Sequence, residues 1–242
     1  MTYNVHKVIP ISDINPARNT PIISRIFMFA TVGVFLIIQP KNQIELFNFF
    51  YQYSAIPCGL VNFSPISESQ FYNNDCFNSK SSSRFSEQNL LLSVISDNFF
   101  HADCITILGN LWSFWIFGNN VEDKLGKFRY IIFLIFIGIM SVSVHTYLNQ
   151  DSLIPIVGAS GIVSGLMGAY VFMFPNARLL VLVPFGFLFP TTIKAKFFMV
   201  FWFLSQILIS ISDQNISWEA HVGGFVFGYL LLRIFNNKRY NI

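Results

Sequence analysis

The chain has 242 residues, of which 53% are hydrophobic and only 11% are charged, and its formal net charge is +3 at pH 7. A soluble globular domain carries roughly a quarter charged residues, so a chain this poor in charge cannot cover its own surface in water, and we expect the lipid bilayer to be its solvent. The basic residues form no run or stripe, so we expect no nucleic-acid partner.

Six segments of the chain are apolar and close to the length that a membrane span needs. A helix needs about 20 residues to cross roughly 30 Å of hydrocarbon. In chain order the segments are residues 21–39, 103–120, 129–148, 156–174, 196–212 and 219–236. The first lacks a small-residue cleavage site, so we interpret it as an anchor helix and not as a removed signal peptide. We therefore predict an all-α, polytopic membrane protein with a single domain over residues 1–242.

A seventh apolar stretch, Leu179 to Pro190, is too short to cross the bilayer. It is interrupted by Pro184 and Gly186. We expect this stretch to lie at the membrane interface or to dip in and out of it.

The positions of the basic residues orient the predicted bundle. If the amino terminus is cytoplasmic, only Lys41, Lys80 and Arg84 fall on the outer side. The cytoplasmic side then receives Lys7, Arg18, Arg25, Lys124, Lys127, Arg129, Arg178, Lys194, Lys196, Arg233, Lys238 and Arg239. This positive-inside bias predicts cytoplasmic tails at residues 1–20 and 237–242. Because we find no Arg-rich, acidic-poor presequence, we expect a bacterial inner membrane as the location.

Residues 40–100 form a long first outer loop that differs in composition from the spans. The loop holds serine-rich runs and short apolar pieces, which suggest short amphipathic helices lying on the membrane. Cys58 and Cys76 both fall in it. If the loop lies outside the cytoplasm the two cysteines can form a disulfide, and two unpaired thiols are the equal alternative.

The fourth and sixth predicted spans each open with small residues. The motifs are Gly158-Ala159-Ser160-Gly161 and Ala220-His221-Val222-Gly223-Gly224. Gly161 and Gly165 are four residues apart, as are Gly224 and Gly228, and such pairs let two membrane helices approach closely. We assign Gly158 to the same packing role, and we predict that the two helices touch through these glycines.

A contact between these glycine faces would bring a nucleophile to a base. His221 shares a helical face with Gly224 and Gly228, at the spacings i, i+3 and i+7. Ser160 and His221 would then lie near the outer ends of adjacent helices, where the imidazole could accept the proton of the serine hydroxyl. The pattern therefore predicts serine chemistry at the outer side of the membrane.

Further polar residues fit such a site. Ser160 stands at a helix amino terminus, where free N–H groups favour a developing oxyanion. Asn110 could add a side-chain donor, and His101 lies nine residues before it, near the same surface. No Asp or Glu is placed deep in a span, and Glu219 should point away from His221. We therefore expect a serine–histidine dyad and not a triad.

Each signal also has a structural interpretation when taken alone. Small-residue strings are common packing motifs in membrane helices, and Asn110 could be an ordinary interhelical hydrogen-bonding residue. His145 is interpreted as structural or interfacial, and His6 as a residue of the tail. The prediction of catalysis depends on the combination.

The combination resembles the rhomboid proteases over about residues 20–236. Besides the two motifs above, the similar segments are His101 to Asn110, Leu111-Trp112-Ser113-Phe114-Trp115-Ile116-Phe117-Gly118, Asn120 to Gly126, and Phe174-Pro175-Asn176-Ala177-Arg178. The resemblance implies a six-helix bundle without cofactor or metal. It also implies substrates that are transmembrane segments of other proteins, which come in laterally past the fifth helix and are cut near the outer membrane face.

The resemblance assigns roles to five residues. Ser160 would be the nucleophile, His221 the general base and Asn110 an oxyanion donor. His101 would support the site near the first loop, and Glu122 would be a structural residue of the cytoplasmic turn.

Two positions depart from the family pattern. Many rhomboids have a histidine four residues before the oxyanion asparagine, where this chain has Thr106, which carries no titratable proton. Losing an oxyanion donor costs about 10²–10³ in rate in other enzymes. Ser164 stands where some members place a tyrosine under the histidine ring. Neither change removes the dyad.

Three other functions are alternatives to an active protease. A rhomboid pseudoprotease would bind transmembrane clients without cutting them, and Thr106 keeps this alternative open. A haem or metal carrier could use His101, His145 and His221, but no histidine pair has the spacing i, i+4 and no Cys/His tract exists. A transporter would need paired broken helices in matching halves, which we do not find.

Overall fold

The computed structural model describes residues 9–15, 17–77, 85, 88–185, 187–212 and 217–235. The expected tail 237–242 and His6 lie outside these residues. The described part is mostly helical and holds one small sheet. Its long helices are α1 (Ile22–Gly33), continued by the π-helical turn η1 (Val34–Ile38), α6 (Cys104–Leu125), α7 (Lys127–Leu148), α8 (Ser160–Met173), α9 (Ala195–Ser212) and α10 (Trp218–Phe235).

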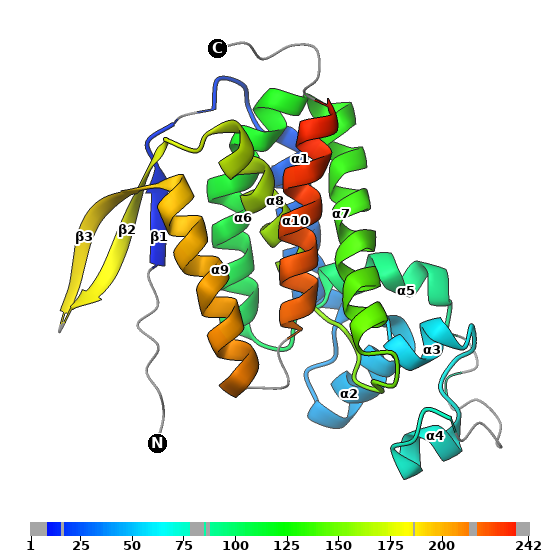
Figure 1. Cartoon of the computed structure of the whole chain (residues 1–242). Coiled ribbons are helices and arrows are strands. Elements are labelled where there is room, and N and C mark those ends of the chain that lie inside the picture. The colour runs from blue at the N-terminus through cyan, green and yellow to red at the C-terminus, as the bar shows by residue number, and fades with distance from the viewer. Residues whose placement is uncertain are drawn as a thin grey trace.

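These helices coincide with the six apolar segments expected from the sequence, and they run roughly side by side (Figure 1). Within the described residues, α7 alone is long and apolar enough to pass as a membrane span by length and composition. The bent pair formed by residues 90–99 and α6 would be a second span, if it is counted as one. The helix α8 lies in the middle of the bundle, packed against α10, α6 and α7.

A buried carboxylate joins the first helix to the bundle. Glu122, near the end of α6, accepts hydrogen bonds from the backbone N–H groups of Ile23 and Ser24 at 2.9 and 2.8 Å. The Ser24 hydroxyl donates to the same carboxylate and lies 3.1 Å from the hydroxyl of Tyr130. The first N–H groups of a helix have no partner within the helix and favour negative charge, so Glu122 caps α1 from a distance of about 100 residues in sequence.

The stretch Leu179 to Pro190, which we expected at the membrane interface, is part of a β-hairpin. It belongs to β2 (Arg178–Phe185) and β3 (Phe187–Lys194), and the amino-terminal strand β1 (Ile9–Asp13) completes an antiparallel sheet in the order β1-β2-β3. The fold is therefore not purely helical, and part of the expected tail 1–20 is a strand. Pro184 disfavours a helix here, and the β-branched and aromatic residues suit a pleated surface.

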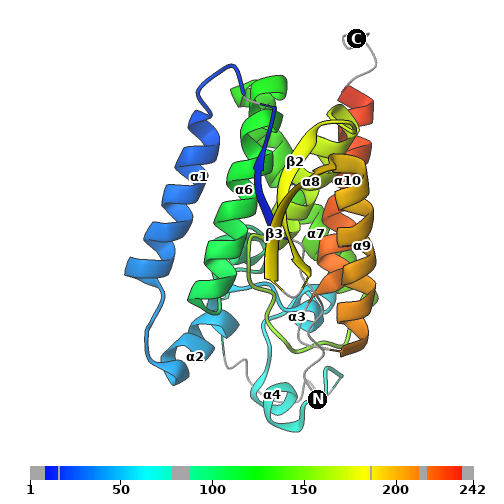
Figure 2. The same cartoon turned by 90° about the vertical axis from the view of Figure 1, so that its left-hand side faces the viewer.

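The sheet packs against α6 and α9 on one side of the bundle (Figure 2). Leu179 and Val181 of β2 are fully buried and join the main hydrophobic core. Asp13 of β1 accepts hydrogen bonds from the side chains of Asn120 at 2.6 Å and Tyr170 at 3.0 Å. These two bonds tie the amino-terminal strand to α6 and α8, and burial raises the pKa of the Asp13 carboxyl.

The segment between α1 and α6 is built from short helices at one end of the bundle (Figure 1). They are α2 (Gln43–Tyr53), α3 (Pro57–Val61), α4 (Glu68–Asn73), α5 (Leu90–Ser96) and the 3₁₀ turn η2 (Asp97–Phe99). Cys58 and Cys76 form a disulfide with a Cα–Cα distance of 5.8 Å. The sequence left a disulfide and two unpaired thiols as alternatives, and the structure contains the disulfide.

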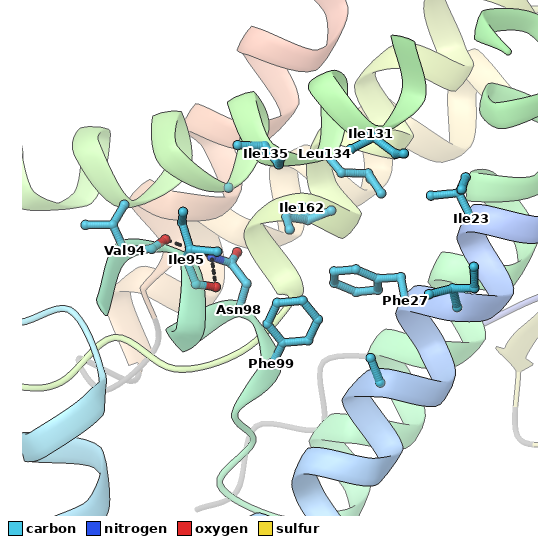
Figure 3. A pocket seen from close by; sticks show the side chains of 13 residues that line it. Ile23, Phe27, Val94, Ile95, Asn98, Phe99, Ile131, Leu134, Ile135 and Ile162 are labelled. Carbon is cyan, nitrogen blue, oxygen red and sulfur yellow. Dashed lines mark hydrogen bonds between the residues drawn. The ribbon is translucent and has the colours of Figure 1, made fainter. Parts of the chain in front are cut away.

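An apolar cavity of about 350 Å³ separates α1 from α7 (Figure 3). Phe27 of α1 packs against Phe99 of η2 in its wall, with ring centroids 4.9 Å apart, and Ile162 of α8 also lines it. Asn98 closes one side, and its amide donates to the carbonyl of Val94 at 3.1 Å. This wall therefore links the short helices between α1 and α6 to the first turn of α8.

Candidate active site

Helices α8 and α10 meet along their glycines. A Cβ atom placed on Gly224 would overlap the backbone carbonyl of Gly161, and one placed on Gly228 would overlap that of Gly165. A Cβ on Gly165 would also collide with the Ile137 side chain of α7. Any larger residue at these positions would force the backbones apart, so the predicted glycine contact is present in the structure.

This close approach brings Ser160 and His221 together. The Ser160 Oγ lies 2.8 Å from the His221 Nε2, which is hydrogen-bonding distance. Ser160 is the first residue of α8, and His221 lies in the first turn of α10. Both side chains are partly buried. The geometry allows a proton to pass from the hydroxyl to the imidazole.

The backbone before Ser160 is held by a residue of the segment between α1 and α6. Gly158 has a φ of +121°, a region that side-chain-bearing residues rarely adopt. Its N–H donates to the carbonyl of Asp97 at 3.0 Å. Gly158 thus serves the turn that leads into α8. We predicted that this glycine allows close helix packing, but in the structure it provides the positive φ that the turn needs.

Asn110 and His101 form a second pair beside this turn. The Asn110 Nδ2 lies 3.0 Å from the His101 Nε2, and the Asn110 amide faces Gly158. Gln39 holds the His101 backbone by two hydrogen bonds, of 2.8 and 3.0 Å. His101 is fully buried, and this burial lowers its pKa to about 4. The ring is therefore neutral at pH 7, and its Nε2 can accept the hydrogen bond from the amide.

Thr106 lies apart from this group. Its side chain is exposed, and its hydroxyl donates to Asp103 at 2.8 Å. Asp103 caps α6 by accepting from the Thr106 N–H at 2.8 Å. This bond holds the pKa of the Asp103 carboxyl below its usual range. Thr106 is therefore part of a helix cap and is not brought to the Ser160 hydroxyl.

One contact of His221 was not expected from the sequence. Gln206 of α9 places its Oε1 2.7 Å from the His221 Nδ1. The Glu219 carboxylate lies 3.1 Å from the Nδ1 of His145 on α7, and it makes its hydrogen bond there and not to His221. Ser164 donates to the carbonyl of Ser160 at 2.7 Å. No sequence spacing relates residues 206 and 221, since they belong to different helices, so this contact could not have been read from the chain.

Within the described part of the chain, no three His, Cys, Asp or Glu side chains are grouped so that they could hold a metal ion. His101, His145 and His221 are engaged with Asn110, Glu219 and Ser160, respectively.

Comparisons with known proteins agree with the resemblance. The sequence model of a family described as "Rhomboid domain" matches residues 88–238. The chain is also 28% identical over 138 residues to a Bacillus subtilis (strain 168) protein named "Putative rhomboid protease YdcA". That alignment covers 57% of this chain and 64% of the relative, so the chain spans less than two thirds of the relative's length.

Proposed function

This chain belongs to the rhomboid family of integral membrane proteins, and on that premise we propose that it is an intramembrane serine endopeptidase. The observation that carries the proposal is the 2.8 Å separation between the Ser160 Oγ and the His221 Nε2. An unassisted serine hydroxyl is a weak nucleophile, and an adjacent base is what activates it.

The proposed reaction is acyl transfer to Ser160. As the Oγ attacks the carbonyl carbon of the scissile peptide bond, its proton moves to the His221 Nε2. The resulting oxyanion is stabilised by the Ser160 N–H and the Asn110 side chain. The imidazolium then gives its proton to the leaving amine, and the C–N bond breaks. A water molecule, deprotonated by His221, hydrolyses the acyl-enzyme and restores the serine.

We propose that the substrates are transmembrane segments of other proteins, which reach the site past α9. The site lies where α8 and α10 begin, near the end of the bundle that carries the short helices between α1 and α6. The disulfide in that segment supports an oxidising compartment on this side. Together with the positive-inside bias, it supports an orientation with both termini in the cytoplasm, in a bacterial inner membrane.

A pseudoprotease that binds transmembrane clients without cutting is the second candidate. The observation in its favour is Thr106, whose hydroxyl is committed to Asp103. An oxyanion site that lacks the histidine common at this position would have one donor fewer.

Labelling by a fluorophosphonate probe, which reacts with activated serines, separates the two candidates. Detergent-solubilised parent protein should be labelled, and Ser160→Ala and His221→Ala should not. Equal labelling of all three proteins would remove the catalytic assignment. If the parent is not labelled and Thr106→His is labelled, the result would favour the second candidate, a pseudoprotease.

A further inference from the structure

The His221 ring is held at both nitrogens by residues of two different helices. Its Nε2 faces Ser160 of α8 at 2.8 Å, and its Nδ1 faces the Oε1 of Gln206 of α9 at 2.7 Å. Gln206 is only 6% exposed, although α9 presents several of its other side chains to the surroundings of the protein. A glutamine buried on a mostly apolar helix is costly in a membrane unless its polar atoms have partners.

The contact with Gln206 decides which ring nitrogen carries the proton. A neutral imidazole has one N–H and one lone pair. The amide oxygen of Gln206 can only accept, so it holds the proton on Nδ1 and leaves the lone pair of Nε2 directed at the Ser160 hydroxyl. In the other tautomer, Nε2 would donate to Ser160 and could not take its proton.

The nearby groups that could otherwise orient the ring are engaged elsewhere. The Glu219 carboxylate lies against His145 at 3.1 Å, and the Ser164 hydroxyl donates to a backbone carbonyl. We propose that Gln206 is a positioning residue of this site, which holds His221 in the tautomer and orientation of a general base. The inference rests on the proposed function, and it adds a neutral third member to the expected dyad.

The location of Gln206 on α9 gives this contact a second consequence. Helix α9 packs mainly on α10, on α8 and on the strands β2 and β3, and Trp202 stacks on Phe225 of α10 with ring centroids 5.7 Å apart. The serine and the histidine belong to α8 and α10, but the orienting group does not. The proposed orientation of His221 therefore depends on the packing of α9 against α10.

The test reads the tautomer directly. Protein labelled with ¹⁵N-histidine in detergent gives distinct ¹H–¹⁵N signals for the two tautomers of a neutral imidazole, and His221→Ala identifies the signal of His221. We expect the parent to carry the proton on Nδ1. Gln206→Leu, which removes the acceptor, should shift His221 towards the Nε2-protonated form, and Gln206→Glu, which restores an acceptor, should return it.

The same variants are compared in fluorophosphonate labelling. Gln206→Leu should lower the maximal labelling rate roughly 10–100-fold and leave the half-saturating probe concentration unchanged, because orienting a base affects proton transfer and not probe binding. Leu204→Ala, at a 54% exposed position of the same helix, is the matched control and should label like the parent. Gln206→Met, of similar length, replaces Gln206→Leu if that variant does not fold.

The two proposals fail in different ways. If folded Gln206→Leu, or Gln206→Met in its place, still carries the His221 proton on Nδ1, the proposed role of Gln206 is overturned, whatever the labelling shows. A parent that is not labelled at all would overturn the protease function, and the tautomer spectra would still decide whether Gln206 orients the ring.

Discussion

The amide of Asn110 is the candidate donor on which the proposed oxyanion site most depends. It is held next to the Gly158 turn by the neutral ring of His101, at 3.0 Å. A donor aimed in advance at the developing charge contributes far more than one that must be reoriented during the reaction.

We expect Asn110→Ala to lower the fluorophosphonate labelling rate by about 10²–10³, because one oxyanion donor is lost. The free energy of unfolding should also fall by about 1–3 kcal/mol, because the variant leaves the Nε2 of the buried His101 without its partner. Leu108→Ala, at a 66% exposed position two residues earlier, serves as the control. A labelling rate within a factor of two of the parent would exclude Asn110 from the site.

His101 gives the protein a measurable dependence on pH. Its pKa is lowered to about 4 by burial, against an ordinary value of 6.5. As the pH falls below about 6.5 the unfolded chain takes up a proton on this ring and the folded protein does not, so the free energy of unfolding decreases down to about pH 4. The loss between pH 7 and 5 should be about 1–2 kcal/mol.

Unfolding of the parent and of His101→Gln, followed in detergent at pH 7 and 5, isolates this effect. Burial raises the pKa of Asp97, which acts in the opposite direction, but this contribution is common to both proteins and cancels in the difference. The parent should lose more stability than the variant on acidification. An equal loss in both would show that His101 titrates normally in the folded state.

At the scale of elements, the site depends on the contact between α8 and α10. Gly224 and Gly228 lie against the backbone of α8 so closely that no Cβ fits between them. Interlocked backbones fix the depth and rotation of both helices, and thereby the separation of Ser160 and His221.

Gly224→Ala should therefore lower the free energy of unfolding by about 1–3 kcal/mol through overpacking and abolish most of the probe labelling. Gly109→Ala is the matched control, because a Cβ there meets nothing within 4 Å. That variant should be as stable as the parent, or up to about 1 kcal/mol more stable through its better helix propensity. Parent-like labelling of Gly224→Ala would contradict the dependence on this contact.

At the scale of the whole molecule, the proposed orientation can be tested with the cysteines. Cys58 and Cys76 are bridged, so Cys104, exposed at the start of α6, is the free thiol. A membrane-impermeant maleimide should label Cys104 in intact cells. In a Cys104→Ser background, Thr20→Cys at the opposite end of the bundle should be labelled only after permeabilisation. The reverse pattern would invert the proposed topology.

The sheet is the part of the molecule that sequence periodicity predicted least well. The run from Leu179 to Pro190 is almost continuously apolar, and a short apolar run does not distinguish a strand from a helix. Its pairing partner in β1 lies more than 160 residues earlier, in a segment that resembles a polar tail. Asp13 of the same strand also bonds to Asn120 and Tyr170, and no local pattern reveals these contacts.

The sequence by itself determined the solvent of this protein, the positions of its long helices and the candidate residues for the proposed chemistry. Composition and apolar segment length are local properties, and so is the spacing that places His221 on one face with Gly224 and Gly228. Tertiary structure decided which groups meet. Gln206 contacts His221, Thr106 takes part in a helix cap, and the amino-terminal strand pairs with the hairpin. These contacts depend on how separate elements are rotated and packed, and the order of the elements along the chain does not reveal them.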